Sequence, residues 1–392
     1  MISIRQCVSE ERIQQLKTQH NSYIFKNIEK RINFYIHLFQ VLKEINGKKI
    51  TAKQIEKKIK SPTILHHKQY ESYINIIFKR PYQFSEKKYN ILKYDDRLKV
   101  KKKDFDIIIS VLENLKSTKN FKHNLLQLDL TIRKDSYNYY YQSLVRRYKP
   151  IDFLQNKLFD YNWFVSLTPD KEWSAYKLTL GLDINVCCYC NKQYIFSLTS
   201  GTEKITRPQL DHFLSQKKHP LLSLNFFNLI PCCKICNSDC KHDQDFSHKE
   251  NLSPYENVPS SQLFAYNYIP NSYLGAIGQN KDLQIIIDNK VESNPDLEKQ
   301  ITNNLIVFEE ELLINEHKDL AQEILKKRHI SNDKYIDILK KTFPDAKLTL
   351  SEAYQIAYGN FYDEKMFHKR PLSKFTKDIA LNTGSLKTKD EF

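Results

Sequence analysis

Two Cys-x-x-Cys pairs, Cys187/Cys190 and Cys233/Cys236, constrain this chain more than any other feature of its sequence. Two thiolates separated by two residues can occupy two corners of a tetrahedral Zn²⁺ site, and two such pairs complete it. Seven of the eight cysteines fall between Cys187 and Cys240. Because the N-terminus carries no export signal, this clustering favours a metal site over disulfides.

Other interpretations of the cysteines are weaker. Cys188 and Cys232 each stand one residue from a pair and offer alternative registers, but they fit the two-residue spacer less well. Buried free thiols are a further alternative. A thiol-redox protein would place its Cys-x-x-Cys pair on a thioredoxin-like βαβ background, which the surrounding pattern does not suggest. We therefore expect a closed, structural zinc site.

The segment between the two pairs predicts a hairpin followed by a helix. Residues 193–198 are expected to form a strand, residues 199–204 a turn containing Gly201, and residues 205–212 the returning strand. The second cysteine pair is expected at the start of a short helix. Zinc would clamp this ββα module, which is too small to hold its geometry by apolar burial alone.

Adjacent residues Asp211 and His212 end the expected second strand. A hard divalent cation needs oxygen ligands, and a hydrolytic reaction needs a base with a pKa near neutrality. Asp211 and His212 supply one of each, and Asn237 can bring a second oxygen from the helix. The position of these residues between two zinc half-sites indicates a catalytic Mg²⁺ or Mn²⁺ centre.

This segment resembles the HNH (ββα-metal) endonuclease family. The matching motifs are Cys187-Cys-Tyr-Cys190, Asp211-His212-Phe213, Asn228-Leu229 and Cys233-x-x-Cys236-Asn237. The resemblance implies that His212 is the general base and that Asp211 and Asn237 hold the catalytic metal. It also implies that Asn228 supports the base and its loop.

The chain also resembles, more loosely, HNH nucleases of bacterial anti-phage systems such as the Septu and retron-associated nucleases. The motifs that carry this likeness are Asn251-Leu-Ser-Pro254-Tyr255 and Arg370-Pro-Leu-Ser-Lys374. Some of those nucleases work beside an ATPase, so the resemblance implies a partner ATPase or other sensor. Cys240 departs from the pattern, because such nucleases often have a basic residue there.

Three lysines near the motif are candidate phosphate contacts: Lys217, Lys218 and Lys241. Cys240 is followed by Lys241 and His242, and the sequence leaves open which of these meets a phosphate. For each single lysine, a solvated surface position is the commoner outcome.

The net charge of +15 is concentrated in the N-terminal half of the chain. Residues 1–150 contain 32 Lys and Arg against 14 Asp and Glu, a net charge of +18, and the rest carries −3. Such asymmetry favours a polyanionic partner, since binding phosphates releases counterions. A lysine-rich surface without a partner is the alternative. Two segments stand out: residues 97–103 (RLKVKKK) and the Tyr-rich residues 137–149, which could stack on bases or simply pack as a helix.

The pattern as a whole predicts a predominantly helical α+β fold with a small zinc-stapled module inserted between helical regions. We expect a basic helical domain at 1–150, the HNH module with its lead-in helix at 151–256, and a C-terminal support region at 257–392. Residues 10–46 should form one or two long helices, and residues 262–268 and 283–287 short strands. The polar tail from Lys374 onward is expected to fray.

Together these features predict a cytoplasmic, metal-dependent endonuclease acting on nucleic acid, with DNA favoured. No run approaches the ~18 apolar residues of a membrane span. The alternative is a non-catalytic zinc-ribbon adaptor, which would need the cysteines but not Asp211, His212, Asn228 and Asn237 together.

Overall fold

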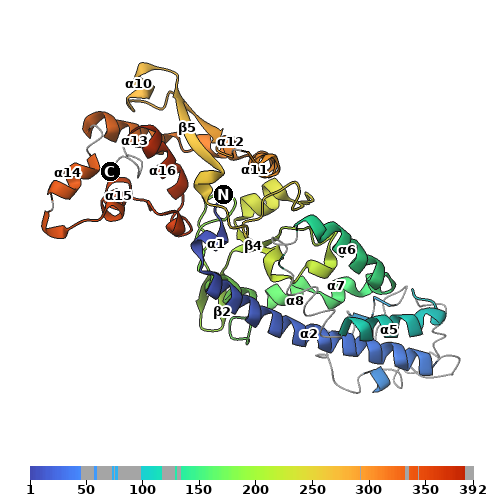
Figure 1. Cartoon of the computed structure of the whole chain (residues 1–392). Helices are drawn as coiled ribbons and strands as arrows, with labels where there is room; N and C mark the ends of the chain where they lie inside the picture. Colours follow the sequence, from blue (N-terminus) through green and yellow to red (C-terminus); the bar gives the residue numbers. More distant parts are fainter. Residues whose placement is uncertain are drawn as a thin grey trace.

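The computed structural model describes residues 1–45, 57–59, 73–74, 76–77, 99–116, 129, 134–291, 293–331, 335–342 and 344–384. Of residues 134–140 and 331 it describes the backbone alone. The molecule is elongated: helix α2 runs along one side toward α5, and helices α13 to α16 gather at the opposite end (Figure 1).

Most of the described chain is helical, as predicted. The α-helices are α1 Ile4–Cys7, α2 Glu10–Glu44, α5 Phe105–Lys116, α6 Lys134–Tyr148, α7 Gln155–Leu158, α8 Tyr161–Ser166, α9 Ala175–Leu182, α10 Tyr273–Ala276, α11 Pro295–Val307, α12 Glu310–Asn315, α13 Lys318–Ser331, α14 Tyr335–Thr342, α15 Leu350–Tyr358 and α16 Ser373–Asn382. Short 3₁₀ segments are η2 Lys102–Asp104, η4 Lys149–Leu154, η5 Pro220–Leu222, η6 Phe226–Asn228, η8 Ser260–Gln262, η10 Pro344–Ala346 and η11 Glu364–Met366, and η7 Ile235–Lys241 is a π-helix.

Residues 10–44 form one helix, α2, within the segment expected to contain one or two. Ser9 caps it by accepting from Arg12 N. Ile13, Leu16 and Ile24 begin a buried stripe that recurs along one face at helical spacing. None of the helices in the described parts of the chain is both long and apolar enough to cross a bilayer.

Three small antiparallel sheets of two strands each complete the fold. The pairs are β1 Leu198–Ser200 with β2 Glu203–Thr206, β3 Gln209–His212 with β4 Leu229–Cys232, and β5 Phe264–Pro270 with β6 Leu283–Asn289. The strands expected at 262–268 and 283–287 are thus confirmed as β5 and β6.

A hairpin does turn at Gly201, where β1 pairs with β2 and Leu198 lies opposite Thr206, but the strand bounds predicted for it, 193–198 and 205–212, are wrong. Pro208 lacks an N–H and divides the expected returning strand into β2 and β3. Residues 193–195 instead pair back onto 185–187, where Cys187 N donates to Gln193 O and Ile195 N donates to Asn185 O. β3 is therefore free to pair with the fully buried β4, and the ββα order is β3, β4, η7.

The buried apolar side chains form two clusters. The first joins α2, α5 and α9 to the cysteine segment, so residues on both sides of position 150 share one core. The second packs the β5/β6 sheet against α13, α15 and α16. The domain boundaries at 150 and 256 stay a prediction.

The expectation that the chain frays from Lys374 onward is wrong. Residues 373–382 form α16, whose Phe375 and Ile379 are fully buried. Lys374 is buried too, and its ammonium donates to Asp378 Oδ2 at 2.8 Å and to Phe264 O at 2.6 Å. The apolar stripe of α16 was hidden by the polar residues between its members.

Candidate functional site

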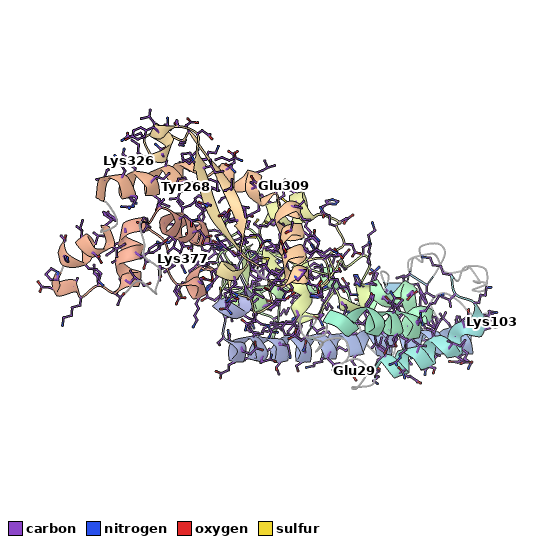
Figure 2. The ribbon with its side chains drawn as sticks, turned by 45° about the horizontal axis from the view of Figure 1, so that its top comes forward. Glu29, Lys103, Tyr268, Glu309, Lys326 and Lys377 are labelled. Carbon is purple, nitrogen blue, oxygen red and sulfur yellow. The ribbon has the colours of Figure 1, made fainter. Side chains whose placement is uncertain are left out.

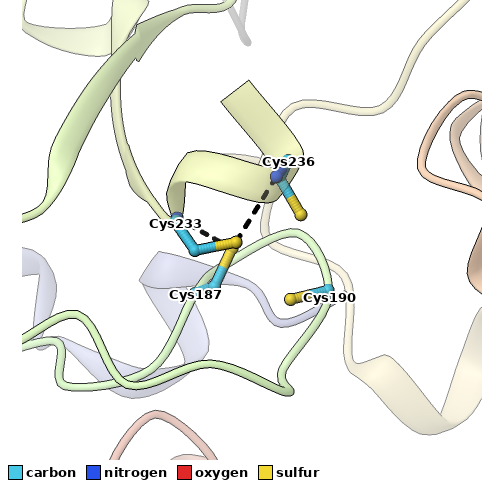
Figure 3. Close-up of side chains that lie close together, drawn as sticks. All are labelled: Cys187, Cys190, Cys233 and Cys236. Carbon is cyan, nitrogen blue, oxygen red and sulfur yellow. Dashed lines mark hydrogen bonds between the residues drawn. The ribbon is translucent and has the colours of Figure 1, made fainter. Parts of the chain in front are cut away.

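The four predicted zinc ligands lie together in the interior. Cys187 and Cys190 come from the loop after α9, and Cys233 and Cys236 from the end of β4 and the start of η7 (Figure 3). Their four sulfur atoms lie within 4.8 Å of one another. A tetrahedral Zn²⁺ with Zn–S bonds of ~2.3 Å needs sulfurs about 3.8 Å apart, so the cluster is consistent with a zinc site.

The surrounding backbone favours thiolates at this cluster. Cys233 N donates to Cys187 Sγ at 3.3 Å, and Cys236 N donates to Cys233 Sγ at 3.4 Å. Hydrogen bonding from the Cys187 thiol lowers the pKa of Cys190 well below the ordinary thiol value and also lowers the pKa of Cys233. Burial raises the pKa of Cys187, and hydrogen bonds with Cys190 and Cys233 raise the pKa of Cys236, so two of the four thiols give up their protons more readily than the other two. The alternative ligands Cys188 and Cys232 are buried outside this set of four.

A cleft of about 770 Å³ opens beside the zinc module. Three predicted catalytic residues, Asp211, His212 and Asn237, line it together with the candidate phosphate ligands Lys217 and Lys241. Asp211 and His212 are the last residues of β3, and Asn237 lies on η7. The ββα arrangement thus brings residues more than twenty positions apart to one wall.

His212 has the hydrogen bonding of a neutral base. Its Nε2 lies 2.9 Å from the carbonyl oxygen of Ser223, so that nitrogen must carry the proton. Burial lowers the pKa of the ring to about 4, which keeps the imidazole neutral near physiological pH but makes it a weaker base than the near-neutral one expected from the sequence. Among the described residues nothing donates to Nδ1, which leaves that nitrogen able to take a proton. The ring of Tyr161 packs edge-on against it, with centroids 4.4 Å apart.

Asp211 is a buried, heavily bonded carboxylate. Tyr189 OH donates to its Oδ2 at 2.6 Å, and Lys241 Nζ donates to its Oδ1 at 2.8 Å. Lys241 Nζ also donates to the carbonyl oxygen of His212 at 2.6 Å, and this bond holds the lysine side chain at the end of β3. Each carboxylate oxygen retains a second lone pair, so Asp211 can still ligate a cation at the cleft surface.

Asn237 reaches the cleft from η7. Its Nδ2 donates to Gln209 Oε1 at 2.7 Å, and Ser238 Oγ donates to the same oxygen at 3.1 Å. This bond turns the amide so that, within the described residues, Asn237 Oδ1 accepts no hydrogen bond. Asn237 can therefore offer an oxygen to a cation bound near Asp211.

Asn228 lies behind the cleft and is fully buried. Its Oδ1 accepts from Leu214 N at 2.7 Å, and its Nδ2 donates to Leu214 O and Leu222 O, both at 3.1 Å. The amide therefore ties the loop after His212 to the loop that carries Ser223. Because its side chain is fully buried, Asn228 has no direct access to the cleft.

The three candidate phosphate lysines differ in environment. The side chain of Lys217 is 81% exposed at the cleft mouth, 3.9 Å from Asp243. Lys218 pairs with Asp245 at 2.9 Å. Lys241 is buried on Asp211, so its ammonium has protein partners where a phosphate was expected. Cys240 lies half-buried on η7, outside the zinc set.

Several cleft residues were missed in the sequence. Gln209 and Arg207 lie two and four residues before Asp211, so strand alternation could have placed them on the same face. Tyr161 and Lys157 come from α8 and α7, about fifty residues away in sequence. No local signal could have assigned these two to the cleft.

Comparison with known proteins finds a distant relative that matches part of the chain. No family model matches the chain, and no solved structure matches it. Over 89 residues the chain is 29% identical to the Septu protein PtuB of Bacillus thuringiensis. The matching part covers 23% of this chain and 32% of that relative, so the chain spans about a third of the relative's length. The similarity to a Septu protein suggested by the motifs is therefore supported over part of the chain.

Proposed function

We propose that this protein is a metal-dependent HNH endonuclease that hydrolyses phosphodiester bonds in nucleic acid, with DNA favoured. The observation that carries the proposal is the state of His212. The ring is neutral and oriented by Ser223, and it lines a cleft shared with Asp211 and Asn237. A base of this kind beside two oxygen ligands suits metal-assisted hydrolysis.

Each residue has a role in this scheme. His212 Nδ1 takes the proton from the attacking water. The Asp211 carboxylate and Asn237 Oδ1 would hold a Mg²⁺ or Mn²⁺ ion, which supplies Lewis-acid stabilisation of the developing charge. Asn228 keeps the His212 loop in place through its three hydrogen bonds. Lys217 contacts a substrate phosphate from the cleft mouth, where its ammonium is exposed.

The four-cysteine cluster binds a structural Zn²⁺ in this proposal. Four thiolates close the coordination sphere, so that ion has no open position for a substrate. The clamp joins the Cys187 loop to β4 and η7, and so fixes Asn237 relative to β3.

We further propose that a partner restrains or activates the enzyme. The relative's assignment to the Septu system and the family resemblance favour an ATPase or other sensor. Co-purification of the chain with an ATPase expressed from its native operon tests this. A chain that migrates alone and cuts constitutively contradicts it.

A second candidate is a non-catalytic zinc-ribbon adaptor that binds nucleic acid. One observation favours it: both Asp211 oxygens already accept hydrogen bonds, and Lys241 neutralises the carboxylate. An adaptor predicts nucleic-acid binding without strand cleavage at any divalent metal concentration.

The two candidates separate in one assay. Purified protein is incubated with plasmid, single-stranded DNA and RNA in the presence of Mg²⁺, Mn²⁺ or EDTA. The endonuclease proposal predicts cleavage that depends on added metal and stops with EDTA. The adaptor is supported if the protein binds all substrates but cleaves none of them, both alone and together with the co-purified partner.

A further inference from the structure

A second cavity, of about 650 Å³, lies in the basic N-terminal part of the chain. Cationic side chains from two distant segments line it, and together we name them the basic pocket: Lys99, Lys101, Lys103, Arg146 and Lys149. Asp104 is the one carboxylate among its described lining residues. The described parts of the two sequence segments that stood out for their charge thus meet here, Lys99–Lys103 from the first and Arg146–Lys149 from the second.

The fold brings these cations together through α5. Residues Lys99 to Lys103 lead through η2 into α5, and α5 packs on η4, the segment that follows α6. The cavity therefore opens over the first turn of α5, between its N-terminal lysines and the C-terminal end of α6. Unpaired amides at a helix N-terminus add partial positive charge to the lysines there.

The cations of the basic pocket are available for a ligand. All five are solvent-exposed. Within the described part of the chain, the side chains of Lys99, Lys101, Lys103 and Arg146 form no ion pair. Burial raises the pKa of Asp152, and the positive charge of nearby Lys149 opposes that rise. Holding so many like charges over one cavity costs energy, which a bound polyanion would relieve.

The basic pocket lies next to the candidate catalytic cleft. Lys149, Pro150 and Phe153 line the pocket, whereas Asn156 and Lys157 on the same short segment line the cleft. Phe153 and Asn156 are three residues apart, so their Cα atoms are separated by at most about 11 Å. That distance spans only a few nucleotides of one strand, at ~3.4 Å per step.

Helix α6 makes a second connection between the two sites. Tyr141 on α6 donates through its OH to the carbonyl of Lys218 at 3.2 Å, and its ring lies 4.6 Å from that of His219. Both contacts are on the loop that bears Lys217. Five residues later on the same helix, about 7.5 Å along its axis, Arg146 lines the basic pocket.

We propose that the basic pocket binds the phosphate backbone of nucleic acid that is engaged in the catalytic cleft. The inference rests on the proposed function in one respect, namely that the cleft takes nucleic acid. A strand that leaves the cleft across α7 and η4 then meets Arg146 and the Lys99 to Lys103 run. The contacts are to phosphates, so they add affinity without sequence preference.

Binding without catalysis tests this directly. The full chain carrying His212→Ala is titrated, in EDTA, against a fluorescent DNA duplex of about 30 base pairs at several salt concentrations. Fluorescence anisotropy gives the slope of log Kd against log salt. Replacing Lys99, Lys101 and Lys103 with Gln should reduce that slope by about 2.7, or ~0.9 for each phosphate that the variant no longer neutralises.

The matched control removes the same charge far from the basic pocket. Lys326, Lys340 and Lys341 are exposed, and Figure 2 shows Lys326 at the end of the molecule opposite Lys103. Replacing these three with Gln should leave the slope unchanged. Between about 50 and about 200 mM salt, the parent should therefore lose about 40-fold more affinity than the pocket variant, and the control as much as the parent.

The outcomes separate this proposal from the proposed function. The proposal is overturned if the pocket variant folds like the parent and keeps the parent's slope of log Kd against log salt. It is also overturned if the control variant shows the same reduction of that slope as the pocket variant. No binding of duplex or single-stranded DNA or RNA by the parent overturns it too. A reduced slope in the pocket variant alone supports it, even if the parent cuts no substrate, in which case only the nuclease assignment fails.

Discussion

Lys241 and Asp211 form a buried ion pair, 2.8 Å between Nζ and Oδ1, on the wall of the cleft that holds His212. Each side chain is almost fully removed from solvent, at 2% and 4% exposure. Lys241 therefore balances the charge of a proposed metal ligand and, through the His212 carbonyl, braces the end of β3.

Replacing Lys241 with Met should destabilise the protein strongly. The change keeps the apolar stem but leaves Asp211 buried with only the Tyr189 hydroxyl as partner. Breaking a buried pair on one side typically costs about 3 to 5 kcal/mol. Urea denaturation should show that loss, and added Mn²⁺ should restore more stability to the variant than to the parent, because Asp211 then lacks its competing cation.

Lys217→Met is the control for this change. Lys217 is 81% exposed at the same cleft, and its carboxylate neighbour Asp243 is 71% exposed. If Lys217→Met lowered the free energy of unfolding as much as Lys241→Met, the buried ion pair would not be the cause of the loss.

Removing one zinc ligand should release the metal. Cys233→Ser is expected to lower bound zinc from about one ion per chain to near zero, because three thiolates hold Zn²⁺ far less tightly than four. The melting temperature should fall with it, since the clamp between the Cys187 loop and η7 opens. Metal analysis and thermal denaturation measure both effects.

Cys240→Ser serves as the matched control, because Cys240 is half-buried on η7, the helix that carries the zinc ligand Cys236, but lies outside the cluster. It should retain zinc and stability. Parent protein without zinc but of normal stability would refute the assignment, as would Cys233→Ser protein with a full zinc complement.

His20 should make the fold sensitive to acid. The ring is fully buried, Trp173 Nε1 donates to its Nδ1 at 3.1 Å, and burial lowers its pKa to about 4. The unfolded ring has a pKa near 6.5, so below that pH the unfolded state binds the extra proton and folding stability falls. Between about pH 7 and about pH 5 the loss from this residue is roughly 2 kcal/mol.

His20→Gln removes that titration. The free energy of unfolding, measured by urea at both pH values, should fall less in the variant than in the parent. His212 and His368 also have pKa values lowered to about 4 by burial, so part of the acid sensitivity should persist. Identical pH dependence in parent and variant would show that His20 is not held neutral by the fold.

Asn228→Ala should weaken both folding and cleavage. The change leaves Leu214 N, Leu214 O and Leu222 O without their buried side-chain partner, at a cost of about 3 kcal/mol. The His212 loop loses its tie, so cleavage at saturating metal should fall. Asn156→Ala, at an exposed position on the cleft edge, should change stability little. Equal effects of the two changes would rule out a positioning role for Asn228.

The chemistry of the site could be predicted from the sequence better than its geometry. Cys-x-x-Cys spacing determines which sulfurs meet, since each pair closes its own turn, and the structure selects Cys187/Cys190 and Cys233/Cys236 over Cys188 and Cys232. Asp211 and His212 are likewise neighbours in the cleft because they are consecutive in the sequence.

The strand pairing could not be obtained in this way. Local pattern indicated the hairpin on Gly201, which β1 and β2 form, but it did not indicate that β3 pairs with β4 across a loop of sixteen residues. The choice depends on burial of β4 and on the use of residues 193–195 by the cysteine loop, both of which are long-range properties. For the same reason, Tyr189 and Lys241 as partners of Asp211 were visible only in three dimensions.

The central claim is that His212 is the general base of a metal-dependent nuclease, and one comparison tests it most directly. Cleavage of the preferred substrate is measured for the parent, for His212→Ala and for His242→Ala, an exposed histidine of the same cleft. We predict that His212→Ala loses at least about 100-fold in rate while keeping its zinc, and that His242→Ala stays close to the parent. Cleavage by zinc-loaded His212→Ala at the parent's rate would contradict the account.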